Sequence, residues 1–255
     1  MKWKAVWTIA LAVGCAQAGS AGERVAAADQ SEKRGFLYGA GLIVSEEPYI
    51  GYGTRVIPIP VLGYVGERLR VLGPFVSYDV LQAESSRVSL RAAPRFQGFE
   101  ESDSDFFEGM EDRDSSIDAG LGFNYEQEDW KFEAAAMFDT LGKSDGYELS
   151  TRLGRVFRRG PVFLEPSLAF SYLDDNNVDY YYGVRESEQT DSRVAYKGDS
   201  TVNTTIGFSV ATPMLFGGFT QFAIDHTWNG SNINDSPLIN SDSQWSVRML
   251  FSKYF

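Results

Sequence analysis

The chain offers one evident candidate for acid–base chemistry, the neighbouring pair Asp225 and His226. A histidine beside carboxylate and hydroxyl groups can act as a general base. The surrounding residues alternate in type, with Phe222, Ile224, His226 and Trp228 on one parity and Gln221, Ala223 and Asp225 on the other. This alternation predicts a strand, whose successive side chains point to opposite faces. Asp225 would then not orient His226, and we predict no catalytic residue here.

A second candidate is the acidic run between residues 100 and 114. Carboxylate oxygens are the ligands that Ca²⁺ and Mg²⁺ prefer. The spacing lacks the fixed ligand positions and the turn glycine of a calcium-binding loop. We therefore expect a solvated loop and no metal site, and leave open weak binding of divalent cations at its rim. The carboxylates of the run include Glu100, Glu101, Asp103, Asp105, Glu108, Glu111 and Asp112.

The composition excludes several other classes of site. The 255 residues include 23 Lys and Arg against 35 Asp and Glu, a formal net charge of −12. Nucleic-acid binding depends on basic residues that neutralise phosphates, so no nucleic-acid partner is expected. The single cysteine excludes a disulfide framework and a cysteine-rich zinc site. The single histidine excludes a multi-histidine metal centre, and we expect no cofactor.

The first eighteen residues have the pattern of a secretory signal peptide. Lys2 and Lys4 precede the apolar run 5–13, and Ala16-Gln17-Ala18 is a small-x-small cleavage site. We predict a signal peptide over residues 1–18, cleaved after Ala18, and a flexible leader over residues 19–35. Two alternatives remain open, an uncleaved membrane anchor and a lipoprotein acylated at Cys15.

After the leader, the dominant signal is alternation with a period of two. From Ile117 to Glu126, apolar residues occupy the odd positions, and polar or small residues occupy all of the even ones. Such strands fit either a soluble β-sandwich or a transmembrane β-barrel. An export signal, strands of about ten residues and an aromatic C-terminal residue favour the barrel. His226 would then lie at a membrane interface, where amphipathic rings are enriched. The last strand carries Trp245, Val247, Met249, Phe251 and Phe255 on one face.

We therefore predict an all-β fold, a single antiparallel transmembrane β-barrel over residues 36–255. Eleven runs can be counted, whereas bacterial single-chain barrels have even numbers of strands. The uncertain stretch is 56–81, where Pro58, Pro60 and Gly73-Pro74 interrupt the pattern. We predict twelve strands, with ten as the alternative. The runs are 36–45, 55–64, 68–81, 86–97, 116–126, 130–140, 147–157, 162–173, 200–211, 219–228 and 244–255.

The lumen of such a barrel would carry charges of both signs. A mixed-charge interior suits ion pairs that fill a narrow lumen, and long loops would face outward while short turns face the periplasm. A twelve-stranded barrel is narrower than the porins that hold an open aqueous channel. The predicted inward charges are Arg91, Arg95, Asp118, Glu126, Lys131, Glu133, Asp139, Glu148, Arg152, Glu165 and Arg248.

The order of several short motifs resembles the MipA/OmpV family of outer-membrane proteins, which is named for an MltA-interacting protein. The resemblance runs from about Gly39 to Phe255. The motifs are Pro48-Tyr49-x-Gly51, Pro58-x-Pro60, Gly109-Met110 followed by Asp118, Tyr182-Gly183, and Asp235-Ser236-Pro237. The serine usual after Gly51 is Tyr52 here, and the acidic stretch around residues 100–114 is an insertion.

The resemblance implies a non-enzymatic barrel in the outer membrane, surrounded by lipid and lipopolysaccharide. One member is described as a scaffold between a murein hydrolase and a murein synthase, so a scaffold or binding role in peptidoglycan processing is the expectation. The alternative is a narrow channel for small solutes, and a barrel lipid hydrolase or protease is a weaker one. The oligomeric state is not specified by the sequence.

Overall fold

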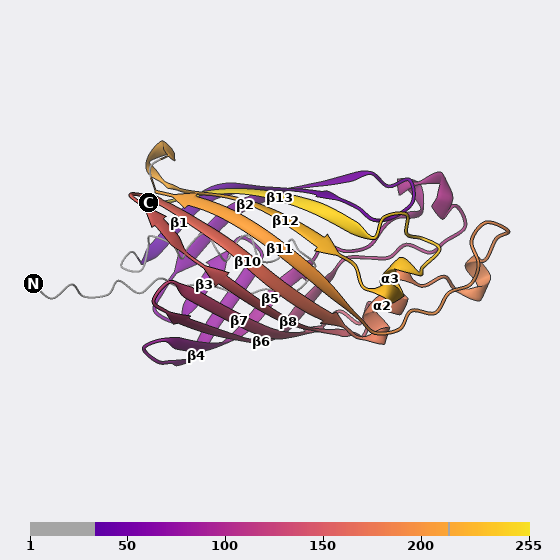
Figure 1. Ribbon diagram of the computed structural model, residues 1–255, viewed down its shortest axis with the longest axis horizontal. Helices are drawn as coiled ribbons and strands as arrows, with labels where there is room; N and C mark the ends of the chain where they lie inside the picture. The colour runs from indigo at the N-terminus through magenta and orange to yellow at the C-terminus, as the bar shows by residue number, and fades with distance from the viewer. Residues whose placement is uncertain (1–33, 214) are drawn as a thin grey trace, which may run out of the picture.

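The computed structural model describes residues 34–213 and 215–255. These residues form a closed antiparallel barrel of twelve strand crossings, which confirms the predicted fold class and strand number. Figure 1 shows the strands running steeply tilted, with the long loops at one end and the C-terminus at the other. We call these the loop end and the turn end. The predicted signal peptide, Ala18 and almost all of the leader lie outside the described residues. Within the described residues, no helix has the length and apolarity needed to span a membrane.

The sheet is continuous in chain order and closes through β10 and β11. Short helices occur in the loops, namely α2 (Asp175–Tyr182), α3 (Ser231–Asn234) and the 3₁₀ turns η1 (Glu101–Asp103), η2 (Asp105–Phe107), η3 (Glu186–Glu188) and η4 (Leu215–Gly217). The strands are β1 (Gly35–Glu46), β2 (Thr54–Val65), β3 (Leu69–Leu72), β4 (Phe75–Gln82), β5 (Ser86–Arg95), β6 (Ser116–Gln127), β7 (Trp130–Asp139), β8 (Tyr147–Arg155), β9 (Phe157–Arg159), β10 (Val162–Leu173), β11 (Thr201–Thr212), β12 (Phe219–Trp228) and β13 (Ser243–Tyr254).

Two of these labelled strands, β8 and β9, make up one crossing. Both pair with β10, and the ladder is interrupted between the pairs Ser167–Gly154 and Leu164–Phe157. Pro166 lies in β10 at this interruption and has no N–H to donate to a ladder. The thirteen labelled strands of the described chain therefore cross the barrel wall twelve times.

The stretch that left the strand count uncertain is a short hairpin. The expectation of one strand over 68–81 is wrong, because the chain reverses at Gly73 and Pro74 between β3 and β4. Gly73 has a positive φ of 58°, which glycine adopts without strain. The split supplies the twelfth strand and excludes the ten-stranded alternative. β3 is only four residues long, so this hairpin is shorter than the rest of the wall.

The two faces of the wall follow the predicted alternation. On β6, Ile117 and Leu121 are 45% and 52% exposed, whereas Asp118 on the other parity is fully buried. The final strand behaves likewise, with Trp245 and Met249 outward and Arg248 inward. Apolar side chains thus face outward. The inward face is polar along much of the lumen, and a buried apolar cluster that includes Leu37, Val61, Phe219 and Leu250 fills the rest.

The aromatic C-terminus secures the seam of the barrel. The backbone N–H of Phe255 donates to the carbonyl oxygen of Phe36 at 3.1 Å, and its ring lies 5.1 Å from that of Tyr38. Phe251 lies on the outward face of β13 and contacts the ring of Phe216. The last strand is therefore fixed to the first at the turn end.

Candidate functional site

Asp225 and His226 lie on opposite faces of β12, as the alternation predicts. The His226 ring lies outside, 4.4 Å and 4.2 Å from the ring centroids of Trp228 and Trp245. Asp225 points into the lumen and is 3% exposed. The barrel wall separates the two side chains, so they do not form an acid–base pair.

Asp225 instead joins two arginines across the lumen. Its carboxylate accepts from Arg152 of β8 at 3.2 Å and forms a short ion pair with Arg248 of β13. All three side chains are at least nine-tenths buried. Both charges of a buried ion pair have lost their hydration, so each is stabilised mainly by its attraction to the other.

A second buried network joins β5, β6 and β8. The Arg95 guanidinium donates to Asp118 at 2.6 Å and 2.9 Å and lies 3.1 Å from Glu148. Smaller pairs join Lys131 to Glu165 at 3.0 Å and Arg70 to Asp79. The charged residues of the lumen thus form ion pairs, and the predicted inward residues lie inside. Those that are buried are Arg91, Arg95, Asp118, Glu126, Glu133, Glu148, Arg152 and Arg248, and those that are partly buried are Lys131, Asp139 and Glu165.

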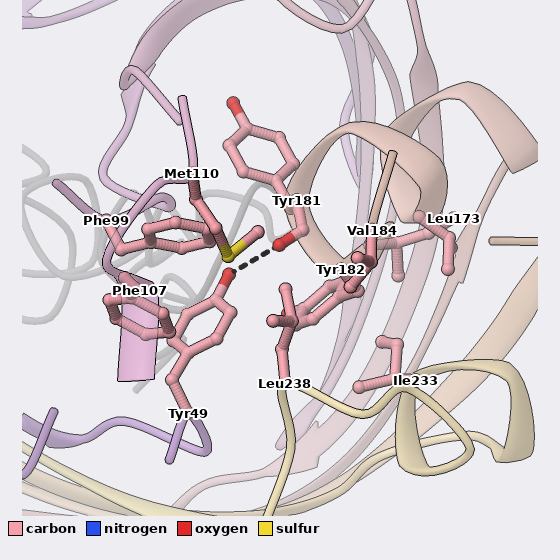
Figure 2. Packing of buried hydrophobic residues seen from close by; sticks show 11 residues of the cluster. Tyr49, Phe99, Phe107, Met110, Leu173, Tyr181, Tyr182, Val184, Ile233 and Leu238 are labelled. Carbon is pink, nitrogen blue, oxygen red and sulfur yellow. Dashed lines mark hydrogen bonds between the residues drawn. The ribbon is translucent and has the colours of Figure 1, made fainter. Parts of the chain in front are cut away.

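An apolar cluster covers the loop end of the barrel, and we call it the cap. It is contributed by four separate loops, which converge over the lumen. Figure 2 shows its aromatic rings packed edge to face and stacked, with Tyr49 near the centre. The rings of Phe99 and Phe107 stack at 4.2 Å, and those of Tyr49 and Tyr182 at 5.6 Å. The buried members of the cap are Tyr49, Phe99, Phe107, Met110, Leu173, Val178, Tyr181, Tyr182, Val184, Ile233 and Leu238.

Hydrogen bonds fix the four loops to one another. The Tyr49 hydroxyl donates to the carbonyl oxygen of Tyr181 at 3.1 Å, the bond drawn in Figure 2. The Ser236 hydroxyl donates to the carbonyl oxygen of Tyr182 at 2.6 Å. The Gln97 amide donates to the Tyr182 hydroxyl at 2.6 Å and so connects the cap to the end of β5. The cap is therefore a single packed unit.

Most motif positions singled out in the sequence meet in this cap. Gly51 needs its positive φ of 77°, and a Cβ there would lie 2.3 Å from the Ser104 hydroxyl. The other motif positions lie elsewhere: Asp118 is in the lumen, and Pro58 and Pro60 are on the lipid face of β2. The positions brought to the cap and its edges are Pro48, Tyr49, Gly51, Gly109, Met110, Tyr182, Gly183, Asp235, Ser236 and Pro237.

The phenols of the cap are not poised for acid–base chemistry. Burial raises the pKa of Tyr49 and of Tyr182 well above the ordinary value of tyrosine, and neighbouring acidic and phenolic groups raise it further. Both hydroxyls therefore stay protonated at neutral pH and serve as packed hydrogen-bonding groups.

The acidic loop uses several of its carboxylates to hold its own backbone. Glu101 accepts from the N–H of Gly109 at 2.6 Å, and Asp112 accepts from the N–H of Glu101 at 2.7 Å. Among residues 34–213 and 215–255, no three histidine, cysteine or acidic side chains gather in an arrangement that would hold a metal ion.

An ion pair that sequence reasoning missed ties this loop to the loop after α2. The Arg113 guanidinium donates to both carboxylate oxygens of Glu188 at 2.8 Å and 3.0 Å, and both side chains are buried. Arg193 donates to the carbonyl oxygens of Glu188 and Glu108. In the sequence, this pair was indicated only by the presence of arginines in otherwise acidic loops.

The ion pair between Arg113 and Glu188 predicts that acid loosens the cap. Burial raises the pKa of Glu188, but hydrogen bonds from Arg113 and from the N–H groups of Arg185 and Glu111 outweigh it and hold the pKa below the ordinary 4.5. The pair therefore stabilises the loops fully above about pH 4.5, and this stabilisation is lost as the pH falls through the lowered value.

Hydrogen exchange of residues 98–115 and 184–197 at pH 7, 5 and 3, corrected for the intrinsic rate, should show protection that falls only at the lowest pH. A Glu188→Gln variant should start with weaker protection and lose this pH dependence. Equal protection of the native loops at all three pH values would contradict the assignment.

Beneath the cap lies a cavity of about 110 Å³, enough for several water molecules. The apolar residues that line it include Ile57 and Phe96. The ion-paired residues Arg152, Asp225 and Arg248 line it as well. The sequence did not indicate this cavity, because its walls come from strands far apart in the chain.

The chain is similar to a family of known proteins over most of its length. The family model for the MltA-interacting protein MipA matches residues 38–255. The chain is 28% identical to the putative outer membrane protein YiaT of Escherichia coli K12, covering 82% of this chain and 86% of that protein. It is 26% identical to the MltA-interacting protein of the same strain, covering 83% of this chain and 86% of that protein. Among solved structures it is similar to the Ralstonia pickettii toluene transporter TbuX, with 10% identity and a TM-score of 0.43. The match covers 88% of this chain and 90% of that protein.

The family match spans nearly all of the described barrel, and the curated relatives are outer membrane proteins. Long loops of such barrels face outward and short turns face the periplasm, so the cap lies outside the cell and the C-terminus at the periplasmic end. The chain belongs to the MltA-interacting protein MipA family and is a β-barrel of the outer membrane.

Proposed function

We propose that the chain is a non-enzymatic scaffold that holds a murein hydrolase at the inner surface of the outer membrane. The observation that carries the proposal is the closed interior: apart from the cavity of about 110 Å³, ion pairs and an apolar cluster occupy the lumen, and the cap covers its outer end. A barrel closed in this way acts through its surfaces. One relative is called MltA-interacting protein, which supports a hydrolase as the partner.

The turn between β11 and β12 is the surface we assign to this partner. Phe216 is 80% exposed and Leu215 is 47% exposed, at the periplasmic end. Phe216 has a positive φ of 55°, which is uncommon for a bulky residue and costs about 1 kcal/mol or more. Figure 1 shows η4 standing out sideways from the barrel wall beside the C-terminus. An exposed aromatic in a strained turn fits a contact residue at an interface.

Replacement of Phe216 by aspartate is expected to weaken capture of an MltA-type hydrolase by at least about tenfold, as loss of a central aromatic contact does. Surface plasmon resonance with the full chain in lipid nanodiscs measures the dissociation constant. Leu141→Asp is the matched control, because Leu141 is 53% exposed at the opposite end of the barrel. Unchanged affinity of the Phe216 variant would remove this turn from the interface, and absence of binding by the native protein would overturn the scaffold proposal.

The second candidate is a narrow channel for small solutes. The cavity beneath the cap favours it, since polar groups and space for water lie along the lumen. Opening would require the cap to move, and conductance in planar bilayers tests whether it does.

A further inference from the structure

A cluster of basic side chains lies at the periplasmic end of this acidic protein. Arg155 is the last residue of β8, and Arg158 and Arg159 end β9, in a chain whose formal net charge is −12. All three side chains are exposed. Because like charges repel one another, such a cluster is more stable when an anion lies beside it.

Two of these arginines lie on the lipid-facing side of the wall. Arg155 shares its parity with Leu153, which is 45% exposed on the outer face of β8. Both β8 and β9 pair with β10 in one register, so Phe157 and Arg159 lie on the same face as Arg155. Arg158 has the opposite parity and does not belong to this row. Arg155 and Arg159 therefore lie at the edge of the lipid face that is nearest the periplasm.

Arg155 is held between two aromatic rings. Trp130 is its partner across the β7–β8 ladder, and the guanidinium carbon lies 5.2 Å from the centroid of the Trp130 ring and 5.1 Å from that of Phe157. The face of an aromatic ring attracts a cation, and tryptophan is enriched where hydrocarbon meets water. The guanidinium is therefore positioned at the level of the lipid head groups.

The donors of Arg155 and Arg159 remain available to a ligand. Within residues 34–213 and 215–255, neither guanidinium forms an ion pair or a hydrogen bond. The adjoining β6–β7 turn carries Glu128 and Asp129, and the N–H of Val156 donates to the carbonyl oxygen of Asp129 at 2.8 Å. Neither of these carboxylates lies within ion-pair distance of the two arginines. A guanidinium carries five N–H donors, so two sets of donors face the membrane boundary.

The chemistry of this surface fits the phosphate of a lipid. The planar guanidinium matches phosphate oxygens with two parallel hydrogen bonds. Phe132 and Leu153 form the next outward pair of the β7–β8 ladder, further into the membrane, and both are exposed. An acyl chain can lie along this pair, whereas a free phosphate would leave it uncovered. An ammonium in the same head group would be repelled by Arg155 and Arg159, so an anionic head group is favoured over a zwitterionic one.

We propose that Arg155 and Arg159 bind the phosphate of an anionic phospholipid in the inner leaflet of the outer membrane. One acyl chain of this lipid lies along Phe132 and Leu153, and the Trp130 ring keeps Arg155 in position. The site uses none of the residues assigned to the scaffold surface, so either proposal can fail without the other.

The lipid preference is tested by native mass spectrometry of the full chain in detergent, titrated with phosphatidylglycerol or with phosphatidylethanolamine of the same acyl chains. The first phosphatidylglycerol should bind at least about tenfold more tightly than the first phosphatidylethanolamine. The variant Arg155→Gln/Arg159→Gln should lose most of this preference while keeping its heat-modifiable band. Arg34→Gln/Arg68→Gln is the matched control, because it removes two exposed positive charges from the same end of the barrel and should keep the preference. Equal affinity of the native protein for the two lipids, or an unchanged preference in the Arg155/Arg159 variant, would overturn the site.

Two further measurements test the source of the phosphate and the role of the ring. Inorganic phosphate at the concentration of the lipid should not displace phosphatidylglycerol, and displacement would assign the arginines to a soluble phosphate and overturn the lipid site. Trp130→Leu should weaken phosphatidylglycerol binding by about threefold, the effect of losing one exposed cation–π contact. Trp130→Phe keeps a ring face and should bind almost as tightly as the native protein. Native affinity in the Trp130→Leu variant would overturn the positioning of Arg155 by this ring.

Discussion

Replacement of Asp225 by alanine should destabilise the barrel by about 3–5 kcal/mol, the usual effect of removing one partner of a buried ion pair. The Asp225 carboxylate is the shared partner of Arg152 and Arg248, and all three groups are buried. Its removal leaves two guanidinium groups close together inside the lumen. The variant should therefore unfold at lower urea concentration in detergent micelles, and its folded band on a cold gel should convert to the unfolded position at a lower temperature.

Two controls separate this effect from a general loss of negative charge. Asp145→Asn removes a negative charge from an exposed loop, keeps a residue type that tolerates the positive φ of 55° there, and should leave the urea midpoint unchanged within error. The triple variant Arg152→Met/Asp225→Leu/Arg248→Met replaces the network by apolar groups and should recover much of the loss, because the desolvation cost disappears with the charges. If the Asp225→Ala variant is as stable as the native protein, water in the lumen must solvate the two arginines in place of the carboxylate.

The strand pattern was predictable where lipid enforces it. Each full-length strand exposes one face to hydrocarbon, so apolar residues recur with a period of two over about ten positions, as in β6 and β10. β3 has four residues, too few for a period to be recognised, and the turn signal Gly73-Pro74 was the only indication of the hairpin. The interruption between β8 and β9 was invisible for the same reason.

The loop-end architecture was less predictable, because it depends on contacts between distant loops. The motifs at Tyr49, Met110, Tyr182 and Ser236 could be found in order along the chain, but nothing local indicates that they pack together. The Arg113–Glu188 pair joins residues 75 positions apart. Pro58 and Pro60 interrupt the pattern in β2, but only the register shows that, among the described residues, β2 pairs with β3 over no more than Gly63–Val65.

Removal of the central rings of the cap should open the barrel to ions. In the variant Tyr49→Ala/Tyr182→Ala, each substitution removes a buried ring from the cap, and deletion of a buried aromatic side chain typically costs about 3–5 kcal/mol. The Tyr49–Tyr181 and Gln97–Tyr182 hydrogen bonds are lost as well. The lost free energy destabilises the packing of the loops and not the barrel wall, because neither residue belongs to a strand of that wall. A change of this size raises the population of open loops by roughly a hundredfold or more.

Conductance in planar bilayers measures this opening. The native protein should show few and brief openings, whereas the double variant should conduct for most of the recording, at a level set by the ion pairs that still narrow the lumen. Tyr125→Ala is the matched control, because Tyr125 is a 37% exposed ring on the lipid face of β6 and should leave conductance unchanged. A double variant that stays closed while retaining its heat-modifiable band would show that the lumen networks alone block ions. Native protein that already conducts steadily would favour the channel over the scaffold, because the cap would then not seal the barrel.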